Sequence, residues 1–441
     1  MTQLSQHFTY RKLLRFTFPS IVMIIITSIY GVVDGLFVSN FVGKTAFAAV
    51  NFILPYVMIL GCTGFMFGSG AGALVAKTMG EGDHEKANRI FSLIIYVSFG
   101  VSVALELVGH LTLRSAAVRL GAKGQLLEDA VLYGRIYLMG LPAAMLQYEF
   151  QYLFSTAGKP KLGLYVTLAA GICNMALDAV FVGLFRWGLV GAAAATVLSQ
   201  CAGGFLPTAY FFRKNSSSLR LTATKFEWAV VGRTCFNGMS ELFNNISWAV
   251  VGMLYNMQML RYAGEDGVAA FGVVMYVCMI FLSVFIGYTV GVSPIISFHY
   301  GAENHRELHS VLEKTMILLG VFSVAMVIGS CLLARPLSGI FVGYDEALLE
   351  MTVRGFWIYG ISYLFAGYAT LGSAFFTALN DGLVSAVLSL LRTFVFQVAA
   401  VLVMPMCWGL DGIWAATIAA EAMACVVVFI CLIAKRKKYH Y

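Results

Sequence analysis

Twelve stretches of this sequence are apolar, and each is long enough to cross a lipid bilayer as a helix. A span needs about 20 mostly apolar residues, because a backbone in lipid must satisfy its own hydrogen bonds. The stretches cover residues 13–40, 46–76, 89–111, 131–156, 161–183, 188–211, 234–259, 267–298, 311–333, 352–377, 383–405 and 411–433. With 60% hydrophobic and 12% charged residues, no long segment is left for a soluble domain. The sequence therefore predicts an all-α polytopic membrane protein with twelve transmembrane helices.

The basic residues fall on alternate connections between these stretches. Positively charged loops stay on the cytoplasmic side, so the alternation sets the orientation of the chain. The predicted cytoplasmic set is Arg11, Lys12, Arg15, Lys77, Lys86, Arg89, Lys159, Lys161, Arg213, Lys214, Arg220, Lys225, Arg233, Lys435, Arg436, Lys437 and Lys438. We expect both termini in the cytoplasm and the protein in the inner or plasma membrane of the cell. The formal net charge of +7 is then a topology signal, and we expect no nucleic-acid partner.

The two halves of the chain read as copies of one unit. Adding 221 to a position in the first half often lands on the same residue type, as in Gly43 and Gly264, Gly80 and Gly301, His84 and His305, Gly188 and Gly409, and Thr196 and Thr417. Units of six spans keep one orientation, so two six-helix lobes should be related by a pseudo-twofold axis along the membrane normal. We expect an N-lobe over residues 1–215 and a C-lobe over residues 216–441.

The first half carries four polar residues at membrane depth, and the second half lacks three of them. The set comprises Asp34, Asn174, Asp178 and Thr196, and the offset of 221 converts the first three to Tyr255, Val395 and Ala399. At about 1.5 Å per residue, the set lies on three helices at similar depth, roughly 12–18 Å below the outer surface. Such oxygens could hold a Na⁺ ion or share a proton, and local hydrogen bonding of each acid is the alternative.

Pro19 lies near the cytoplasmic start of the first span. A proline inside a helix removes one backbone hydrogen bond and permits a bend. We therefore expect a hinge in the helix that also carries Asp34.

Other ionisable residues also lie within the predicted spans. Arg392 and Glu421 fall near the membrane centre and could pair, while Glu241 is a competing partner for Arg392. A structural ion pair is as good an interpretation here as a functional one. Glu149 on the fourth span could line a cavity. The nine cysteines show no metal-binding or disulfide spacing, and we expect no cofactor other than a coupling ion.

Short motifs occur in a fixed order along the chain. In the first half, VVDGLFVSNFVG follows Pro19, and MGEGD, STAGKPK, NMALD and GLVGAAAAT come after it. The second half contains NGMSELFNNIS, YGAENHR and GLDGIWAATIAAE. With these motifs the sequence resembles the MATE (multidrug and toxic compound extrusion) transporters over essentially its whole length. The second-half motifs resemble a bacterial branch of multidrug exporters.

This resemblance implies a V-shaped protein whose lobes rock between inward- and outward-open states, driven by Na⁺ or H⁺ entry. It maps the N-lobe cation site of the family onto Asp34, Asn174, Asp178 and Thr196, and the bending proline onto Pro19. On the seventh span, Ser240 replaces the proline of a Gly-x-Pro, and Trp248 replaces an acid that some branches carry. That departure argues against a C-lobe cation site of this type.

The expected function is secondary active efflux of amphipathic, cationic organic compounds in exchange for Na⁺ or H⁺, by a monomer in the lipid bilayer. A lipid-linked-saccharide flippase of the same superfamily is the alternative, although it would favour a strongly basic central cavity. An intramembrane transferase would need clustered catalytic groups at a membrane face. None is visible in the sequence, so we do not expect an enzyme.

Overall fold

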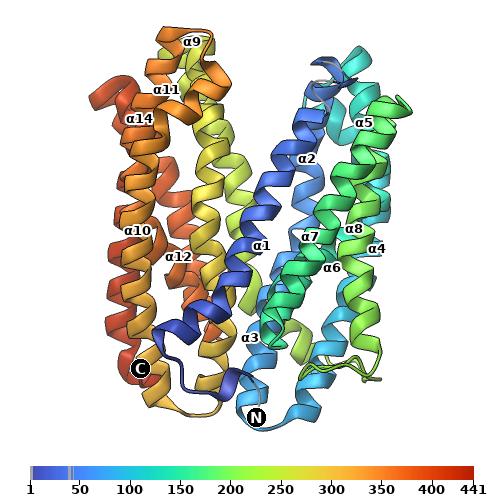
Figure 1. Cartoon of the computed structure of the whole chain (residues 1–441), viewed down its shortest axis with the longest axis vertical. Coiled ribbons are helices and arrows are strands. Elements are labelled where there is room, and N and C mark those ends of the chain that lie inside the picture. Colours follow the sequence, from blue (N-terminus) through green and yellow to red (C-terminus); the bar gives the residue numbers. More distant parts are fainter. Residues whose placement is uncertain (1–2, 38–40, 43) are drawn as a thin grey trace.

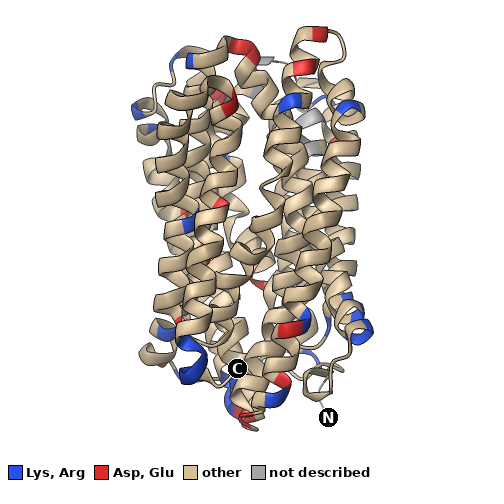
Figure 2. Cartoon of the chain, turned by 90° about the vertical axis from the view of Figure 1, so that its left-hand side faces the viewer, with Lys and Arg blue, Asp and Glu red and all other residues tan. Residues whose placement is uncertain are grey.

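The computed structural model describes residues 3–37, 41–42 and 44–441, and for residues 32, 34–37, 44, 45 and 47 it describes the backbone only. The described residues form helices and connecting turns, with no strand among them. Figure 1 shows two helical bundles that converge at the end holding both termini and separate towards the other end. Figure 2 shows that most charged residues lie at the two ends and few lie between them, as a bilayer requires.

The N-lobe is built from the helices of the first half. After the short 3₁₀ helix η1 (Gln3–Ser5) come α1 (Tyr10–Phe37), α2 (Lys44–Gly61), α3 (Thr63–Gly80), α4 (His84–Arg119), α5 (Gly124–Met139), α6 (Leu141–Thr156), α7 (Pro160–Asp178), the π-helix η3 (Ala179–Leu184) and α8 (Gly188–Phe212). Residues 213–227 then form a linker without helix.

The C-lobe is built from the helices of the second half. They are α9 (Trp228–Gly301), α10 (His305–Val342), α11 (Glu346–Gly360), α12 (Tyr363–Ala378), α13 (Gly382–Leu390), the π-helix η4 (Leu391–Val395) and α14 (Phe396–Tyr439). Two of these helices contain a sharp break at a glycine. Gly264 divides α9 with φ 66° and ψ −152°, and Gly409 divides α14 with φ 57° and ψ −132°.

Twelve spans can be traced through the described residues. Eight continuous helical segments are long and apolar enough to cross a membrane. Two of them are divided by the breaks at Gly264 and Gly409 and therefore supply two spans each. Two further spans are each made of two shorter helices, α5 with α6 and α11 with α12. The predicted twelve-helix, two-lobe fold is confirmed, while the boundary between residues 215 and 216 stays a prediction.

The repeat predicted from the offset of 221 is visible in the backbone. Gly188 and Gly409, which the offset relates, both have φ 57°. Asp83 and Asn304, also related by it, each cap a helix by accepting a hydrogen bond from the backbone N–H three residues on. Equivalent sequence positions thus perform the same local role in the two lobes.

Glycines bring the two lobes into backbone contact where the bundles converge. A Cβ added to Gly70 of α3 would meet the carbonyl oxygen of Thr234 of α9, and one added to Gly238 would meet that of Met66. Further along α9, a Cβ on Gly291 would lie 3.0 Å from the Cα of Thr17 on α1. Small residues allow such close approach between helices, and here they hold α1 and α3 against α9.

The segment before α1 crosses to the C-lobe at the same end. Leu4 and Phe8 are fully buried. The Phe8 N–H donates to Glu307 Oε1 at 2.8 Å, and His7 Nδ1 lies 2.7 Å from Glu307 Oε2. Lys314 Nζ donates to the Phe8 carbonyl oxygen at 2.6 Å. Residues 3–9 therefore fasten the start of the chain to α10.

A buried ion pair lies inside the C-lobe. Arg392 of η4 donates through Nε to both carboxylate oxygens of Glu421 on α14, at 2.9 and 3.2 Å. The side chains are only 14% and 8% exposed. The charges are thus matched within the lobe, as one of the interpretations of the sequence proposed.

We predict that Glu421→Gln destabilises the protein. The substitution would leave a buried Arg392 without its carboxylate, which costs roughly 3–5 kcal/mol when a pair is fully desolvated. Glu128→Gln is the control, because Glu128 pairs with Arg114 at an exposed site, where a pair is worth at most about 1 kcal/mol. Thermal unfolding of both variants in detergent measures the difference. Lost transport by Glu421→Gln at unchanged stability would instead indicate a direct role.

A second prediction concerns the contact between the lobes. Gly70→Ala should destabilise this conformation by about 1–3 kcal/mol, because its Cβ has no space beside the Thr234 carbonyl. Gly100→Ala on α4 is the matched control, since nothing lies within 4 Å of its Cβ. There alanine should stabilise the helix by about 0.5–1 kcal/mol. Unfolding midpoints that shift equally for both variants would contradict the prediction.

Candidate functional site

The four residues of the predicted cation site lie on three helices of the N-lobe. Asp34 is in α1, and its side chain lies outside the described residues. Asn174 and Asp178 lie near the end of α7, and Thr196 lies on α8. Since α7 packs against both α1 and α8, the fold brings together the three helices that carry the set.

The packing of α1 on α7 fixes the level of Asp34. A Cβ on Gly171 of α7 would lie 2.7 Å from the ring of Tyr30 on α1. The helices α1 and α7 are the first and fifth membrane spans, so they run in the same direction. Tyr30 and Gly171 lie at one height, and the residues four positions further along each helix therefore also lie at one height. The α1 backbone therefore carries Asp34 to the height of Asn174 and Asp178.

The side chains on α7 are enclosed by protein. Asp178 is fully buried and Asn174 is 3% exposed. Asp178 is the last residue of α7, and the wider π-helix η3 begins directly after it. Such π-helical turns are frequent at functional sites, because they change the direction of neighbouring side chains.

The donor set fits a hard cation or a proton. Asn174 Nδ2 has no hydrogen-bond partner among the described residues, so its amide is not held by local hydrogen bonds on that side. Thr196 Oγ1 donates to the Ala192 carbonyl at 3.0 Å, which leaves its lone pairs available as a ligand. Carboxylate, amide and hydroxyl oxygens are the ligands that hard cations prefer. Among the described residues no group of three or more His, Cys, Asp or Glu could hold a metal.

A polar network near this set was not identified from the sequence. Gln147 of α6 donates through Nε2 to the Tyr30 hydroxyl at 3.5 Å, and Gln200 of α8 donates to the Tyr137 hydroxyl at 2.9 Å. Tyr30 is four residues before Asp34, and Gln200 is four residues after Thr196. Residues four apart share one face of a helix, so this spacing was a usable signal.

Pro19 lies inside α1 and is buried. The two residues after it, Ser20 and Ile21, lie against Gly287 of α9, whose Cβ would be 2.5 Å from the Ile21 Cα. The proline therefore sits in the part of α1 that touches the C-lobe. A bend at this position would change the contact between the lobes.

The C-lobe contains a neutral network at the position equivalent to the cation site. The hydroxyl of Tyr255, the counterpart of Asp34, donates to Gln397 Oε1 at 2.8 Å and lies 3.0 Å from Thr417 Oγ1. Thr417 is the counterpart of Thr196. The same place in the repeated scaffold is thus filled by hydrogen-bonded side chains without a carboxylate.

The remaining acids of the predicted set lie in different environments. Glu149 is fully buried inside the N-lobe, beside Ser98 of α4, and its role in lining a cavity stays a prediction. Glu241 on α9 is partly exposed and interacts with Asn244 and with the Tyr152 hydroxyl of α6, across the boundary between the lobes. Since Arg392 is hydrogen-bonded to Glu421, Glu241 is not its primary partner.

Comparison with known proteins supports the fold and the repeat. The MatE family model matches residues 19–180 and 242–403, one match in each lobe. The multidrug export protein MepA of Staphylococcus aureus is 23% identical over 431 residues, covering 96% of this chain and 93% of that protein.

Solved structures agree with this family match. A crystal structure of MATE in complex with MaL6 has a TM-score of 0.94 at 21% identity, covering 99% of this chain and 98% of the other. An outward-facing multidrug resistance MATE family transporter of the MOP superfamily has a TM-score of 0.93 at 20% identity, with the same coverage. Because the family model covers most of the sequence and matches both lobes, the chain belongs to the MatE family.

Proposed function

We propose that the protein is a secondary active exporter of amphipathic, cationic organic compounds, driven by the inward movement of Na⁺ or H⁺. The observation that carries the proposal is the buried pair Asn174 and Asp178 on α7, which packs against the Thr196 helix α8 and lies level with the Asp34 backbone, in one lobe only. The equivalent place in the C-lobe holds a neutral network around Tyr255. A relative of similar length is named a multidrug export protein, which supports the choice of substrate class.

The coupling ion acts through the two carboxylates. Asp34 and Asp178 lie at one depth in a medium of low dielectric constant, where two neighbouring negative charges repel strongly. A Na⁺ ion or a proton between them removes that repulsion and lets α1 pack closer to α7. Since Pro19 lies where α1 contacts α9, a change in α1 is transmitted to the boundary between the lobes.

Substrate and coupling ion then oppose each other. The ion favours one position of α1 and the substrate favours the second position. The ion then lowers the affinity of the protein for the substrate, and the substrate lowers its affinity for the ion by the same factor. The lobes rock about the close glycine contacts between α3 and α9, which act as a pivot. Export therefore needs no chemical step, and we propose no enzymatic activity and no cofactor beyond the ion.

We place both termini in the cytoplasm of the cell and the protein, as a monomer, in the plasma membrane. The basic linker and the basic C-terminal end of α14 support this orientation. Both termini lie at the end where the bundles converge, so the chain is then open to the outside (Figure 1). A lipid-linked-saccharide flippase is less well supported, because the buried Arg392 is neutralised by Glu421 and offers no free cation to a phosphate.

Asp34→Asn should abolish gradient-driven efflux and leave folding intact, because the amide mimics the neutralised acid. Asn174→Ala and Thr196→Ala remove only neutral ligands and should weaken the dependence on the coupling ion about tenfold, for a loss on the order of 1–2 kcal/mol. Efflux of ethidium from proteoliposomes under separately imposed Na⁺ and proton gradients measures both effects.

Thr417→Ala is the matched control for Thr196→Ala. It occupies the equivalent place in the C-lobe and should leave the ion dependence unchanged. All variants are compared at equal expression and equal thermal stability. Wild-type efflux by Asp34→Asn would remove α1 from the coupling mechanism.

The orientation makes a separate prediction. In a cysteine-less background, single cysteines at Lys214 and Tyr441 should be protected from an impermeant thiol reagent added to intact cells. Cysteines at Arg114, Arg186 and Arg335 should react, because these positions lie on the outer connections. Labelling of position 214 from outside would refute the topology.

A further inference from the structure

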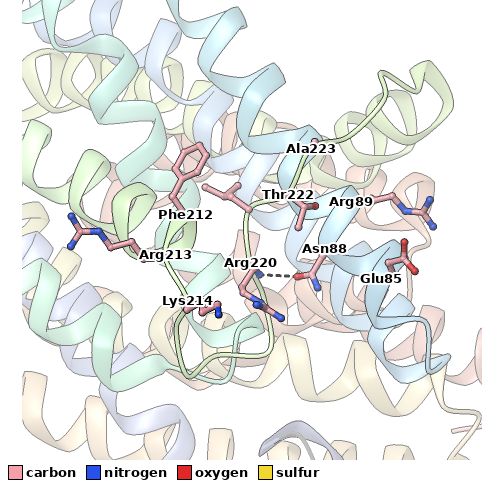
Figure 3. Close-up of a pocket in the computed structure, with 10 residues that line it drawn as sticks. Glu85, Asn88, Arg89, Phe212, Arg213, Lys214, Arg220, Thr222 and Ala223 are labelled. Carbon is pink, nitrogen blue, oxygen red and sulfur yellow. Dashed lines mark hydrogen bonds between the residues drawn. The ribbon is translucent and has the colours of Figure 1, made fainter.

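A hollow lies at one end of the N-lobe, where the linker between the lobes crosses α4 and α8 (Figure 3). Its lining comes from the first turns of α4, the end of α8 and the linker. The residues are Glu85, Asn88, Arg89, Phe212, Arg213, Lys214, Arg220, Leu221, Thr222 and Ala223. It is distant in the sequence from the set around Asp178 and shares no residue with it.

The linker wall of this hollow is fixed by hydrogen bonds. The Arg220 N–H donates to Asn88 Oδ1 at 2.8 Å, the bond drawn in Figure 3, and the Thr222 N–H donates to Ser92 Oγ at 2.8 Å. Leu219, next to Arg220, is fully buried. The Arg220 side chain is therefore carried by a backbone that is fixed against α4.

The charge in the hollow is not neutralised by the protein. Four cations, Arg89, Arg213, Lys214 and Arg220, share it with one carboxylate, that of Glu85. None of these five makes an ion pair in the part of the chain that the structure describes. By contrast, three arginines at the opposite end each pair with a carboxylate, as Arg114–Glu128, Arg335–Glu346 and Arg354–Asp411.

An exposed apolar strip begins beside the basic residues. Phe212 and Tyr96 are both exposed, and their ring centroids are 6.4 Å apart. Exposed aromatic residues continue along the same helix faces, with Phe99 three residues after Tyr96 and Phe205 seven residues before Phe212. Because both helices are membrane spans, this strip faces the acyl chains of the bilayer.

We propose that the hollow and the strip together bind an anionic phospholipid of the cytoplasmic leaflet. The phosphate lies among Arg213, Lys214 and Arg220, and the acyl chains lie along Phe212 and Tyr96. Arginine and lysine recognise phosphate by charge-assisted hydrogen bonds, and basic pockets at the cytoplasmic end of membrane helices suit anionic headgroups. The choice of leaflet depends on the orientation proposed above, whereas the binding chemistry does not.

A bound lipid would also act on the linker. The linker is the covalent connection between the lobes, and its basic residues would be neutralised by the headgroup while it lies against α4. The lipid therefore holds the linker on the N-lobe side. The apolar strip distinguishes a phospholipid from a free phosphate. The acyl chains of a phospholipid can contact Phe212, whereas a free phosphate has no apolar part.

The test is native mass spectrometry of the purified full-length protein in detergent with equal amounts of dioleoyl phosphatidylglycerol and dioleoyl phosphatidylcholine. The wild type should retain phosphatidylglycerol preferentially. The triple variant Arg213→Gln, Lys214→Gln, Arg220→Gln should lose that preference, on the order of fivefold for each cation removed. Phe212→Ser changes no charge and should also reduce retention.

A second triple variant, Arg11→Gln, Lys161→Gln, Lys437→Gln, is the matched control, because it removes three exposed cations at the same end of the molecule. It should keep the preference. An equal loss in this control, or equal retention of both lipids by the wild type, would overturn the proposal. Displacement of the lipid by glycerol phosphate at equal concentration would also overturn it. None of these outcomes depends on transport, so failure here leaves the exporter proposal standing.

Discussion

The two lobes approach each other most closely through backbone atoms of α3 and α9, and the rest of the structure depends on this contact. At Gly70 and Gly238 the chain of one lobe touches a carbonyl oxygen of the other, so no side chain lies between them. In lipid there is little hydrophobic gain in joining helices, and close packing of this kind supplies the attraction instead. The exporter proposal uses this contact as the point about which the lobes tilt.

The lobes share one scaffold but differ in chemistry at a single level of the membrane. Where α1 carries Asp34, α9 carries Tyr255, whose hydroxyl is satisfied by Gln397 and Thr417. The ion pair between Arg392 and Glu421 lies close to that neutral network and is also internally matched. At the corresponding level the N-lobe encloses Asp178 beside Asn174, where a charge is costly unless it is paired. Under the exporter proposal, the packing of this lobe would depend on whether the coupling ion is bound.

Much of this arrangement could be predicted from the sequence, because a lipid bilayer allows few kinds of structure to cross it. Run length located the twelve spans, and the offset of 221 located the two lobes. The spacing of Asn174 and Asp178 placed them on one face of a helix. The contacts of Tyr30 with Gln147 were not predicted, because they join helices that are far apart in the chain. The side chain of Asp34 lies outside the described residues, so its predicted place in the site still awaits a test.

The strap formed by residues 3–9 was also invisible in the sequence, since its partner Glu307 lies about 300 residues away. Under the exporter proposal, this contact has a kinetic consequence. A conformation that opens this end of the molecule would have to pull Phe8 out of its buried position and break the bonds to Glu307 and Lys314. The first few residues of the chain would then contribute to the activation barrier for opening that end. The proposal therefore implies that changes in this short terminal peptide alter turnover without touching the proposed ion site.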